Sequence, residues 1–408
     1  MIERDIFSIL NKDLTRKEIM ALVGPRQIGK TTIMKELFKK CENNGNFISF
    51  ENFKLRDLFE NNIELFIETY VKNNKFLFID EFQYAKNGGK QLKFIFDSYD
   101  NIKIVISGSS QPELAIHSLQ YLVGRVRIYE ILPLTFKEFI QYKSNLNKVL
   151  FNEIRNQDSF KLISLYFEEY LIYGGYPCVV VENTFDEKKL KLQDIVNTYL
   201  LKDIKDILSY KNIYEFENVL KKLALQDGKL LNKSSISMDF EINKNKISEI
   251  ISVLSKTYVL YLLQPYFNNK SKELIKSPKT YFLDLGFKNL LINNFNNLDL
   301  KSDKGEIYEN FICNQLFRSN FKLNFWNEKN RYEVDFVLEK DGNIYGFEIK
   351  SKLSNSNLTN SLKKFIEEFS PKIIYVFNEN IDDEIKYEKT KVIFTNYMNI
   401  FKVIENFK

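Results

Sequence analysis

Histidine and cysteine are scarce in this chain of 408 residues. His117 is the only histidine, which excludes a Ser-His triad and most histidine-based metal centres. The three cysteines, Cys41, Cys178 and Cys313, lie far apart without a CxxC pair, so neither a disulfide framework nor a zinc cluster is indicated. No apolar run approaches the roughly 20 residues that cross a bilayer, and the first residues lack the apolar segment of a signal peptide. We therefore expect a cytoplasmic protein without a membrane-spanning segment.

The composition is that of a globular protein with several domains. Hydrophobic residues make up 44% of the chain and charged residues 28%, as in folded soluble proteins. A chain of this length favours two or three domains. The net charge of +5 arises from 59 basic and 54 acidic residues that are interspersed. This mild excess permits nucleic-acid binding without indicating it.

Two of the 14 glycines stand in a phosphate-loop pattern, G-x-x-x-x-G-K-[ST], that runs from Gly24 to Thr31. An apolar strand is expected before it and a helix after it, which is the setting this motif requires. Backbone N–H groups and the helix N-terminus would then bind phosphates, with Lys30 on the β- and γ-phosphates and Thr31 on Mg²⁺. The predicted ATP site comprises Gly24, Pro25, Arg26, Gln27, Ile28, Gly29, Lys30, Thr31 and Thr32.

An apolar run over residues 76–79 ends in Asp80 and Glu81. This is the pattern of a buried parallel strand whose carboxyl end faces a nucleotide. We expect Asp80 to hold Mg²⁺ through water, and Glu81 to orient and deprotonate the attacking water.

Later residues offer contacts for the γ-phosphate. The segment "NIKIVISGSS" ends in hydroxyl residues, of which Ser109 is our candidate, with Ser107 nearly as good. Arg125, or Arg127, would stabilise the transition state in its own or a neighbouring subunit. A solvated arginine at the start of a strand is an equally consistent interpretation. An arginine that acts across subunits would require a homo-oligomer.

The expected strands at 18–23, 46–51, 75–79, 102–107 and 126–131 alternate with helical segments, which predicts an α/β domain with a mostly parallel sheet. Five blocks resemble the signatures of a prokaryotic AAA+-type ATPase family whose C-terminal domain has long been labelled as of unknown function: "GPRQIGKTT", "FLFIDEFQ", "VISGSS", "LVGRVRIYEILPLTFKEF" and "YLIYGGYP". The segment "AKNGGKQLKFIFD" departs from that family, because a polar Gly-Gly loop stands where a helix is usual.

The resemblance implies four regions. A P-loop ATPase core would span residues 1–140, a helical lid region 141–212, a winged-helix-like domain 213–285, and an α/β domain like restriction endonucleases and other PD-(D/E)xK nucleases 286–408. The turn at Gly174-Gly175-Tyr176-Pro177 is explained by turn chemistry alone, so we favour a structural role for it.

The winged-helix interpretation depends on three helices followed by a hairpin of "YVLYLLQPYF" and "SPKTYFLD". Lys244, Lys246 and Lys256 on or beside the third helix would meet nucleic-acid phosphates. A scaffold that packs on the ATPase core, with these lysines solvated, is equally consistent.

A second hairpin gathers acids. Asp341-Gly342 predicts a two-residue turn that places Asp335 opposite Glu348 and Glu333 opposite Lys350, all on one face. The other face is apolar, with Val334, Phe336, Leu338, Tyr345, Phe347 and Ile349.

Asp-x(12)-Glu-x-Lys is the arrangement of PD-(D/E)xK nucleases, in which Asp335 and Glu348 would bind Mg²⁺ or Mn²⁺ and Lys350 would position water. Glu309, on a preceding helix, would complete the metal site. The alternative is a Glu333–Lys350 ion pair on a fold that has lost its chemistry.

Two functions remain open at this stage. The first is an ATPase that positions a metal-dependent nuclease on DNA. The second is an ATP-driven switch that binds nucleic acid or protein without cleaving it. Binding and hydrolysis of ATP are common to both.

Overall fold

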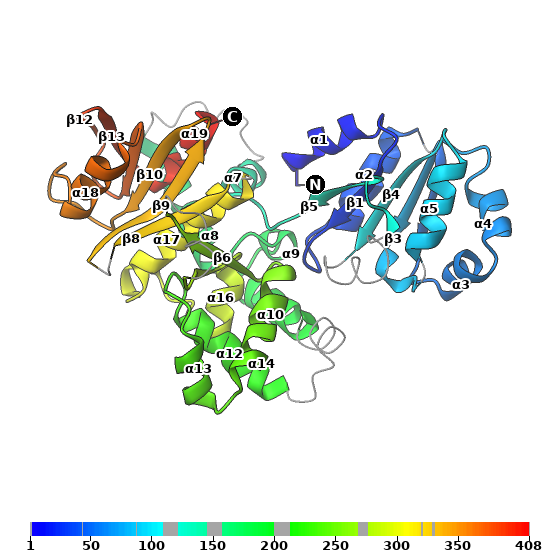
Figure 1. The fold of residues 1–408 in the computed structure, drawn as a ribbon, viewed down its shortest axis with the longest axis horizontal. Helices are drawn as coiled ribbons and strands as arrows, with labels where there is room; N and C mark the ends of the chain where they lie inside the picture. Colours follow the sequence, from blue (N-terminus) through cyan, green and yellow to red (C-terminus); the bar gives the residue numbers. More distant parts are fainter. Residues whose placement is uncertain are drawn as a thin grey trace.

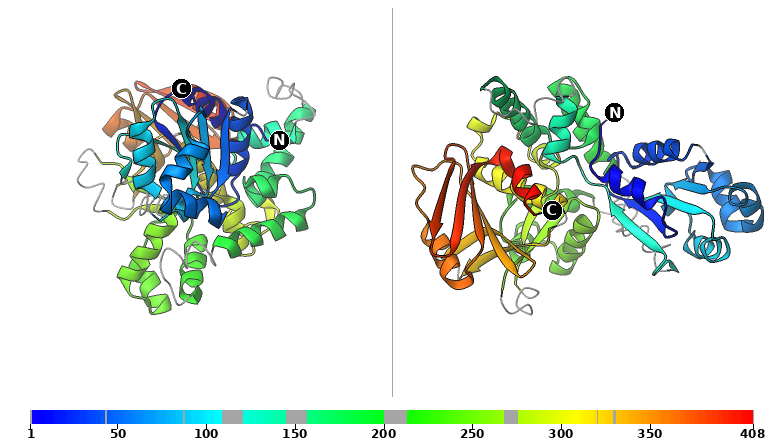
Figure 2. Two further views of the ribbon diagram at one scale, coloured as in Figure 1. Left: turned by 90° about the vertical axis from the view of Figure 1, so that its right-hand side faces the viewer. Right: turned by 90° about the horizontal axis from the view of Figure 1, so that it is seen from above.

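A computed structural model describes residues 2–42, 44–86, 88–108, 121–144, 157–199, 213–267, 276–319, 321–328 and 331–407. Two β-sheets lie at opposite ends of the molecule, and a group of helices lies between and below them (Figure 1). The view from above shows the same separation, with the N-terminal sheet at one end and the C-terminal sheet at the other (Figure 2). Within the described residues, no helix is both long and apolar enough to cross a membrane.

The first sheet has the strand order β2-β3-β4-β1-β5 and is parallel throughout. Its strands are β1 (Ile19–Val23), β2 (Gly45–Ser49), β3 (Phe76–Asp80), β4 (Lys103–Gly108) and β5 (Val126–Glu130). The helices around it are α1 (Ile6–Asp13), α2 (Lys30–Lys40), α3 (Phe53–Asn61), α4 (Ile63–Tyr70) and α5 (Gly88–Ser98), with a short 3₁₀ turn η1 (Phe82–Tyr84). The predicted parallel α/β sheet is confirmed.

Both faces of this sheet are apolar because helices cover both. In β1, Met20 and Leu22 belong to one hydrophobic cluster, while Ile19, Ala21 and Val23 belong to another. Strand β4 lies between β1 and β3, as in ATPases that carry a catalytic glutamate at the end of β3. The carboxyl ends of β1, β3 and β4 therefore meet at one edge of the sheet.

The glycines at 88 and 89 do not form the loop that the sequence suggested. Both lie in the first turn of α5 and are buried. A Cβ added to Gly88 would approach Cζ of Phe82 to 2.6 Å. The small residue is therefore explained by close packing of the helix start on η1.

The helical region begins with α7 (Phe136–Lys143), α8 (Gln157–Tyr173), α9 (Pro177–Val180) and α10 (Phe185–Thr198). It continues with α12 (Ile213–Leu225), α13 (Lys233–Phe240), α14 (Lys244–Lys256) and α16 (Leu285–Leu291). Helices α12, α13 and α14 follow one another as expected for three helices before a hairpin.

The second sheet has eight strands in the order β12-β13-β11-β10-β9-β8-β6-β7. They are β6 (Leu260–Pro265), β7 (Lys279–Phe282), β8 (Leu323–Glu328), β9 (Tyr332–Lys340), β10 (Asn343–Ile349), β11 (Ile373–Asn378), β12 (Asp383–Tyr387) and β13 (Thr390–Asn396). The remaining elements are α17 (Lys304–Arg318), α18 (Asn360–Phe369), α19 (Ile400–Glu405), η4 (Leu298–Leu300) and η5 (Tyr397–Asn399).

The hairpin expected as a wing exists, since β6 and β7 pair antiparallel. However, β6 also pairs with β8 in parallel, so the hairpin is the edge of the larger sheet rather than a free wing. The sheet thus contains β6 and β7, which precede residue 285, together with β8 to β13, which follow it. It therefore crosses the predicted boundary between the winged-helix-like and nuclease-like domains. The division into four domains stays a prediction.

The predicted hairpin register is confirmed from Asn343–Lys340 to Phe347–Phe336. The predicted single apolar face is wrong at one position. Between Asn324 and Trp326 the register of β8 and β9 shifts, so Val334 joins the cluster under α18 while Phe336 packs in the cluster with α17. An extra residue in one strand reverses the side on which later side chains lie.

Candidate nucleotide site and buried charge cluster

The phosphate loop connects β1 to α2, and Lys30 is the first residue of that helix. The lysine is buried, and its Nζ donates hydrogen bonds to the carbonyl oxygens of Gly24 at 2.9 Å and Pro25 at 2.8 Å. Gly29 has φ +92°, which glycine adopts at little cost. The loop therefore holds a cation above a helix N-terminus, and both features favour a bound phosphate.

Three polar residues converge at the carboxyl edge of the sheet. Thr31 donates its hydroxyl hydrogen to Asp80 Oδ2 at 2.7 Å, and the Ser107 hydroxyl donates to Oδ1 of the same carboxylate. Asp80 is 5% exposed. A hydroxyl beside a carboxylate supplies the oxygen ligands that Mg²⁺ prefers, so these residues fit a magnesium–nucleotide complex.

Glu81 follows Asp80 in a left-handed conformation with φ +54°. Its backbone N–H donates to Ser107 Oγ at 3.1 Å, and the Gln83 side-chain amide donates to its carboxylate. A non-glycine residue in this conformation costs on the order of 1 kcal/mol, and such residues cluster at functional sites. Ser107, the second candidate on β4, thus connects both acids. Ser109 lies outside the described residues.

The two arginines lie at the amino ends of the parallel strands, opposite the edge that carries the phosphate loop. Arg125 forms a two-pronged ion pair with Asp97, with N–O distances of 2.8 and 3.0 Å. Arg127 pairs with Glu18 at 3.4 Å and with Asp13. Because β5 runs parallel to β1, with Arg127 beside Met20, its start lies at the end of the sheet away from the loop. A contact with the subunit's own γ-phosphate is therefore not supported, and a role across subunits stays a prediction.

A cavity of about 780 Å³ opens beside the phosphate loop. It is lined by the loop residues Gln27, Ile28 and Gly29, by the N-terminal segment that includes Phe7, and by α9. The α9 contribution comes from Pro177, Cys178 and Val181 (the C-terminal cap of α9), which follow the Gly-Gly turn. Its position and mixed lining suit the base and ribose of a nucleotide whose phosphates lie on the loop.

The four PD-(D/E)xK candidates are brought together in the second sheet. Glu309 projects from α17, Asp335 from β9, and Glu348 and Lys350 from β10 and its end. Asp335 Oδ2 accepts from the backbone N–H of Ile349 at 2.7 Å, and Lys350 Nζ lies 2.7 Å from Glu348 Oε1.

A fifth residue, Lys279 on β7, enters this charge cluster. Its Nζ lies 3.1 Å from Glu309 Oε1 and forms an ion pair with Glu333. The Glu333–Lys350 ion pair considered from the sequence does not form. Glu333 pairs with Lys279, and Lys350 pairs with Glu348.

Burial and crowding of charge shift the protonation of the cluster. Burial, together with the neighbouring carboxylates of Glu348 and Glu309, raises the pKa of Asp335 well above its usual value. Burial also raises the pKa of Glu348, against the lowering effect of Lys350. For Lys279, burial alone would lower the pKa, but the surrounding carboxylates outweigh it and raise the pKa.

The carboxylates of the cluster do not fit a divalent metal as they stand. In the described ranges, no group of three or more His, Cys, Asp or Glu side chains is arranged to hold a metal ion. The acids are instead bonded to lysines and a backbone amide. The assignment of Glu309, Asp335 and Glu348 as metal ligands, and of Lys350 as a catalytic group, therefore stays a prediction without support from the geometry.

Family models match almost the whole chain. An AAA domain matches residues 16–140, and two domains of unknown function, DUF8612 and DUF4143, match residues 164–298 and 304–397. An uncharacterized protein of Methanocaldococcus jannaschii is 30% identical over 345 residues, which is 81% of this chain and 75% of the relative. The chain belongs to the same family as this relative, and its residues 16–140 match an AAA domain.

Other similar proteins add no established activity to this AAA-type protein. An uncharacterized protein of Haemophilus influenzae is 26% identical over 84% of this chain and 85% of its own length. The solved structure of a Walker-type ATPase of Pyrococcus abyssi covers 72% of this chain and 96% of its own, with 14% identity and a TM-score of 0.46. A TM-score of this size does not by itself define a shared fold.

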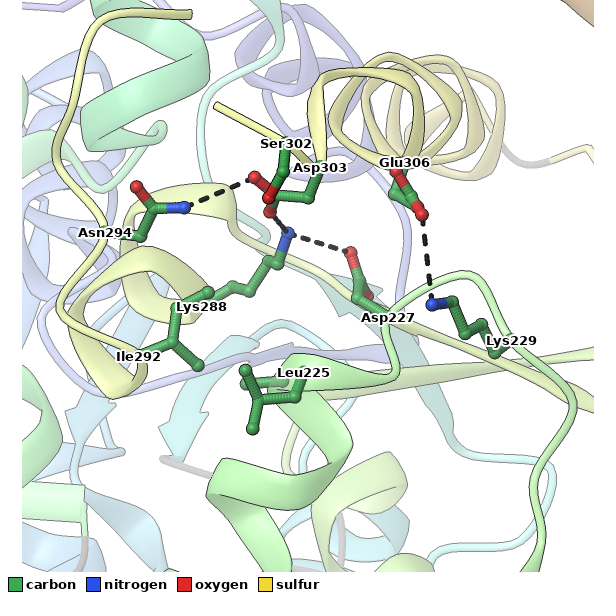
Figure 3. Close-up of a pocket in the computed structure, with 10 residues that line it drawn as sticks. Leu225, Asp227, Lys229, Lys288, Ile292, Asn294, Ser302, Asp303 and Glu306 are labelled. Atoms are coloured by element: carbon green, nitrogen blue, oxygen red, sulfur yellow. Dashed lines mark hydrogen bonds and ion pairs between the residues drawn. The ribbon is translucent and has the colours of Figure 1, made fainter. Parts of the chain in front are cut away.

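The AAA-type protein also has a polar pocket of about 280 Å³ where α12, α16 and α17 meet. Lys288 extends between Asp227 and Asp303, at 3.9 and 2.9 Å, while Lys229 reaches toward Glu306 (Figure 3). These opposite charges largely satisfy one another, which is typical of a structural ion-pair network.

The sequence analysis did not identify Lys279, Cys178 or Gln83 as members of these sites. A lysine at the start of the short strand "KTYF" was the one usable sequence signal for Lys279, and the structure shows all four residues of this strand buried. Cys178 and Gln83 gave no comparable signal, since their roles depend on which elements pack beside them.

Proposed function

We propose that the AAA domain binds and hydrolyses ATP with Mg²⁺ at the edge formed by the phosphate loop, β3 and β4. The observation that carries the proposal is the convergence of Thr31, Asp80 and Ser107, with Glu81 held directly beside them. Bound Mg²⁺ would neutralise charge on the phosphates. Lys30 would exchange its two carbonyl acceptors for phosphate oxygens, and Glu81 would accept the proton of the attacking water.

Two substitutions test this proposal. Lys30→Ala should abolish tight ATP binding, because it removes the buried ammonium group that the loop holds at the helix N-terminus. Glu81→Gln should retain ATP but hydrolyse it at least about 10²-fold more slowly, since the glutamine side chain cannot accept the proton. Fluorescent-nucleotide titration and phosphate release measure the two steps, and Glu51→Gln, an exposed acid beyond β2, is the matched control. Normal turnover in both variants would contradict the assignment.

We further propose that nucleotide state controls a binding activity of the rest of the chain, with nucleic acid as the partner. One hydrophobic cluster runs from the loop residue Ile28 through Tyr176 and Val179 to Leu220 of α12 and Ile250 of α14. A change at the phosphate loop therefore has a packed route to α14, the helix that carries Lys244 and Lys256. This is the binding-switch hypothesis. It is favoured over the nuclease hypothesis because the acid cluster does not fit a metal.

Fluorescence anisotropy with labelled single- and double-stranded DNA tests the switch. Glu81→Gln with ATP should bind differently from Lys30→Ala, and Lys244→Glu with Lys256→Glu should weaken binding without changing ATP turnover. Anisotropy that is independent of nucleotide in every variant would overturn the switch. Plasmid cleavage by wild type that is lost in Asp335→Ala would restore the nuclease hypothesis.

A further inference from the structure

We infer that Lys279 is a built-in cation of the C-terminal acid cluster: its ammonium group occupies the place of a divalent metal, so that this region takes up neither Mg²⁺ nor Mn²⁺. The inference rests on the cluster alone and not on ATP hydrolysis. On this account the PD-(D/E)xK residue types are present, but a lysine instead of a metal ion neutralises the carboxylates.

The position of Lys279 carries the inference. The residue is 5% exposed and begins β7, the edge strand of the sheet. Its ammonium group contacts Glu309 from α17 and Glu333 from β9, two acids on different elements. A single point of positive charge thus joins carboxylates from separate elements, as a metal ion would.

Glu309 Oε1 and both oxygens of Glu333 are already engaged. Glu309 Oε1 accepts both Lys279 Nζ and the Tyr281 hydroxyl, the latter at 2.5 Å. The second oxygen of Glu333 accepts from Asn327 Nδ2 at 3.0 Å. A divalent cation would have to displace these donors and then repel the lysine, which removes much of its binding energy.

One further acceptor is satisfied by a backbone amide. Asp335 Oδ2 takes the Ile349 N–H, and Lys350 covers one oxygen of Glu348. Glu348 Oε2 is buried without a hydrogen-bond partner in the described part of the chain. A divalent cation at this position would draw most of its octahedral shell from water and would lie beside a fixed ammonium group that repels it.

The backbone holds Lys279 in place from both sides. Strand β7 pairs with β6 along one edge. Along the other edge, the N–H of Gly228 donates to the Thr280 carbonyl at 2.7 Å, and the N–H of Leu231 donates to the Pro278 carbonyl at 2.8 Å. Withdrawal of the lysine backbone would break both sets of hydrogen bonds.

Binding of Mn²⁺, followed by electron paramagnetic resonance of the nucleotide-free full chain, tests the inference. A Thr31→Ala background removes the hydroxyl ligand of the nucleotide site. This protein should bind no stoichiometric Mn²⁺, whereas adding Lys279→Met should create one site per chain whose affinity exceeds the non-specific background by about tenfold or more. Lys391→Met is the matched control, because Lys391 pairs with Glu384 on the same sheet but at the surface, and it should gain no site.

Two results would overturn the inference. One is a stoichiometric Mn²⁺ site in the Thr31→Ala protein that Asp335→Asn abolishes. The other is a folded Lys279→Met protein that gains no metal. If Lys279→Met does not fold, Lys279→Gln keeps a donor for Glu309 and carries the same expectation. In the Thr31-intact chain, ATP turnover should survive both Lys279 substitutions, so failure of this inference and failure of the ATPase proposal are distinguishable.

Discussion

At Gly174 the chain requires glycine for two separate reasons. The residue has φ +76°, and a Cβ there would lie 2.1 Å from Oδ1 of Asp284. That buried carboxylate also accepts from the Gly175 N–H at 2.7 Å and caps α16 through the Phe287 N–H. The structural interpretation of the Gly-Gly turn is supported, because the turn seats a carboxylate that starts another helix.

We expect Gly174→Ala to destabilise the protein by about 1–3 kcal/mol more than Gly124→Ala does. Gly124 has a similar φ of +75° but no atom within 4 Å of an added Cβ, so the difference isolates the clash with Asp284 from the cost of the left-handed conformation. Urea unfolding followed by circular dichroism measures both. Equal losses in the two variants would contradict this account of the turn.

At the scale of elements, Asp227 connects the end of α12 to three others, β7, α16 and α17. It follows α12, accepts from the Phe282 N–H of β7 at 2.8 Å, and accepts from Asn310 Nδ2 of α17 at 2.8 Å. Lys288 of α16 lies 3.9 Å away (Figure 3). Burial raises the pKa of Asp227 to about 7, although Lys288 and these hydrogen bonds act in the opposite direction.

This pKa predicts a pH dependence of stability. A carboxyl group whose folded pKa is raised stabilises the fold most below its unfolded pKa of about 4, and that contribution is lost as pH rises through about 7. Between pH 5 and pH 8, wild type should therefore lose roughly 1–3 kcal/mol that Asp227→Asn does not lose. Urea midpoints at the two pH values measure this, with the exposed Asp239→Asn as control. A pH dependence that is unchanged in Asp227→Asn would refute the assignment.

At the scale of the whole molecule, the phosphate loop is packed against the region that follows the AAA domain. Pro25 and Arg26 line a small cavity with Tyr176, Tyr199 and Phe287. Tyr258, just before β6, donates its hydroxyl hydrogen to Glu130 at the end of β5, at 3.2 Å. The nucleotide site is thus bounded by more than the AAA domain itself.

The reactivity of the Cys178 thiol can test whether a nucleotide occupies the cavity beside the phosphate loop. It lines the cavity beside the loop, while Cys41 and Cys313 are buried, so Cys178 should be the thiol that N-ethylmaleimide modifies first. Burial raises its pKa to about 11, so the reaction is slow and is best followed at pH 8.5 by mass spectrometry. We expect saturating Mg²⁺-ATP to slow the modification several-fold in wild type but not in Lys30→Ala. The same rate with and without nucleotide in wild type would place the nucleotide elsewhere.

The sequence by itself determined the features whose causes lie within a few residues. The phosphate loop, the strand that ends in Asp80-Glu81 and the hairpin at Asp341-Gly342 were predictable, because turn chemistry, strand alternation and helix termini are local effects. The parallel α/β sheet followed from the alternation of strands and helices.

Only the tertiary structure decided which distant elements meet. The pairing of β6 with β8, the register shift that turns Val334 to the other face, and the placement of Arg125 away from the loop all depend on strand order. The entry of Lys279 between Glu309 and Glu333 is the clearest case, because the free energy of a buried charge depends on partners that no local pattern specifies.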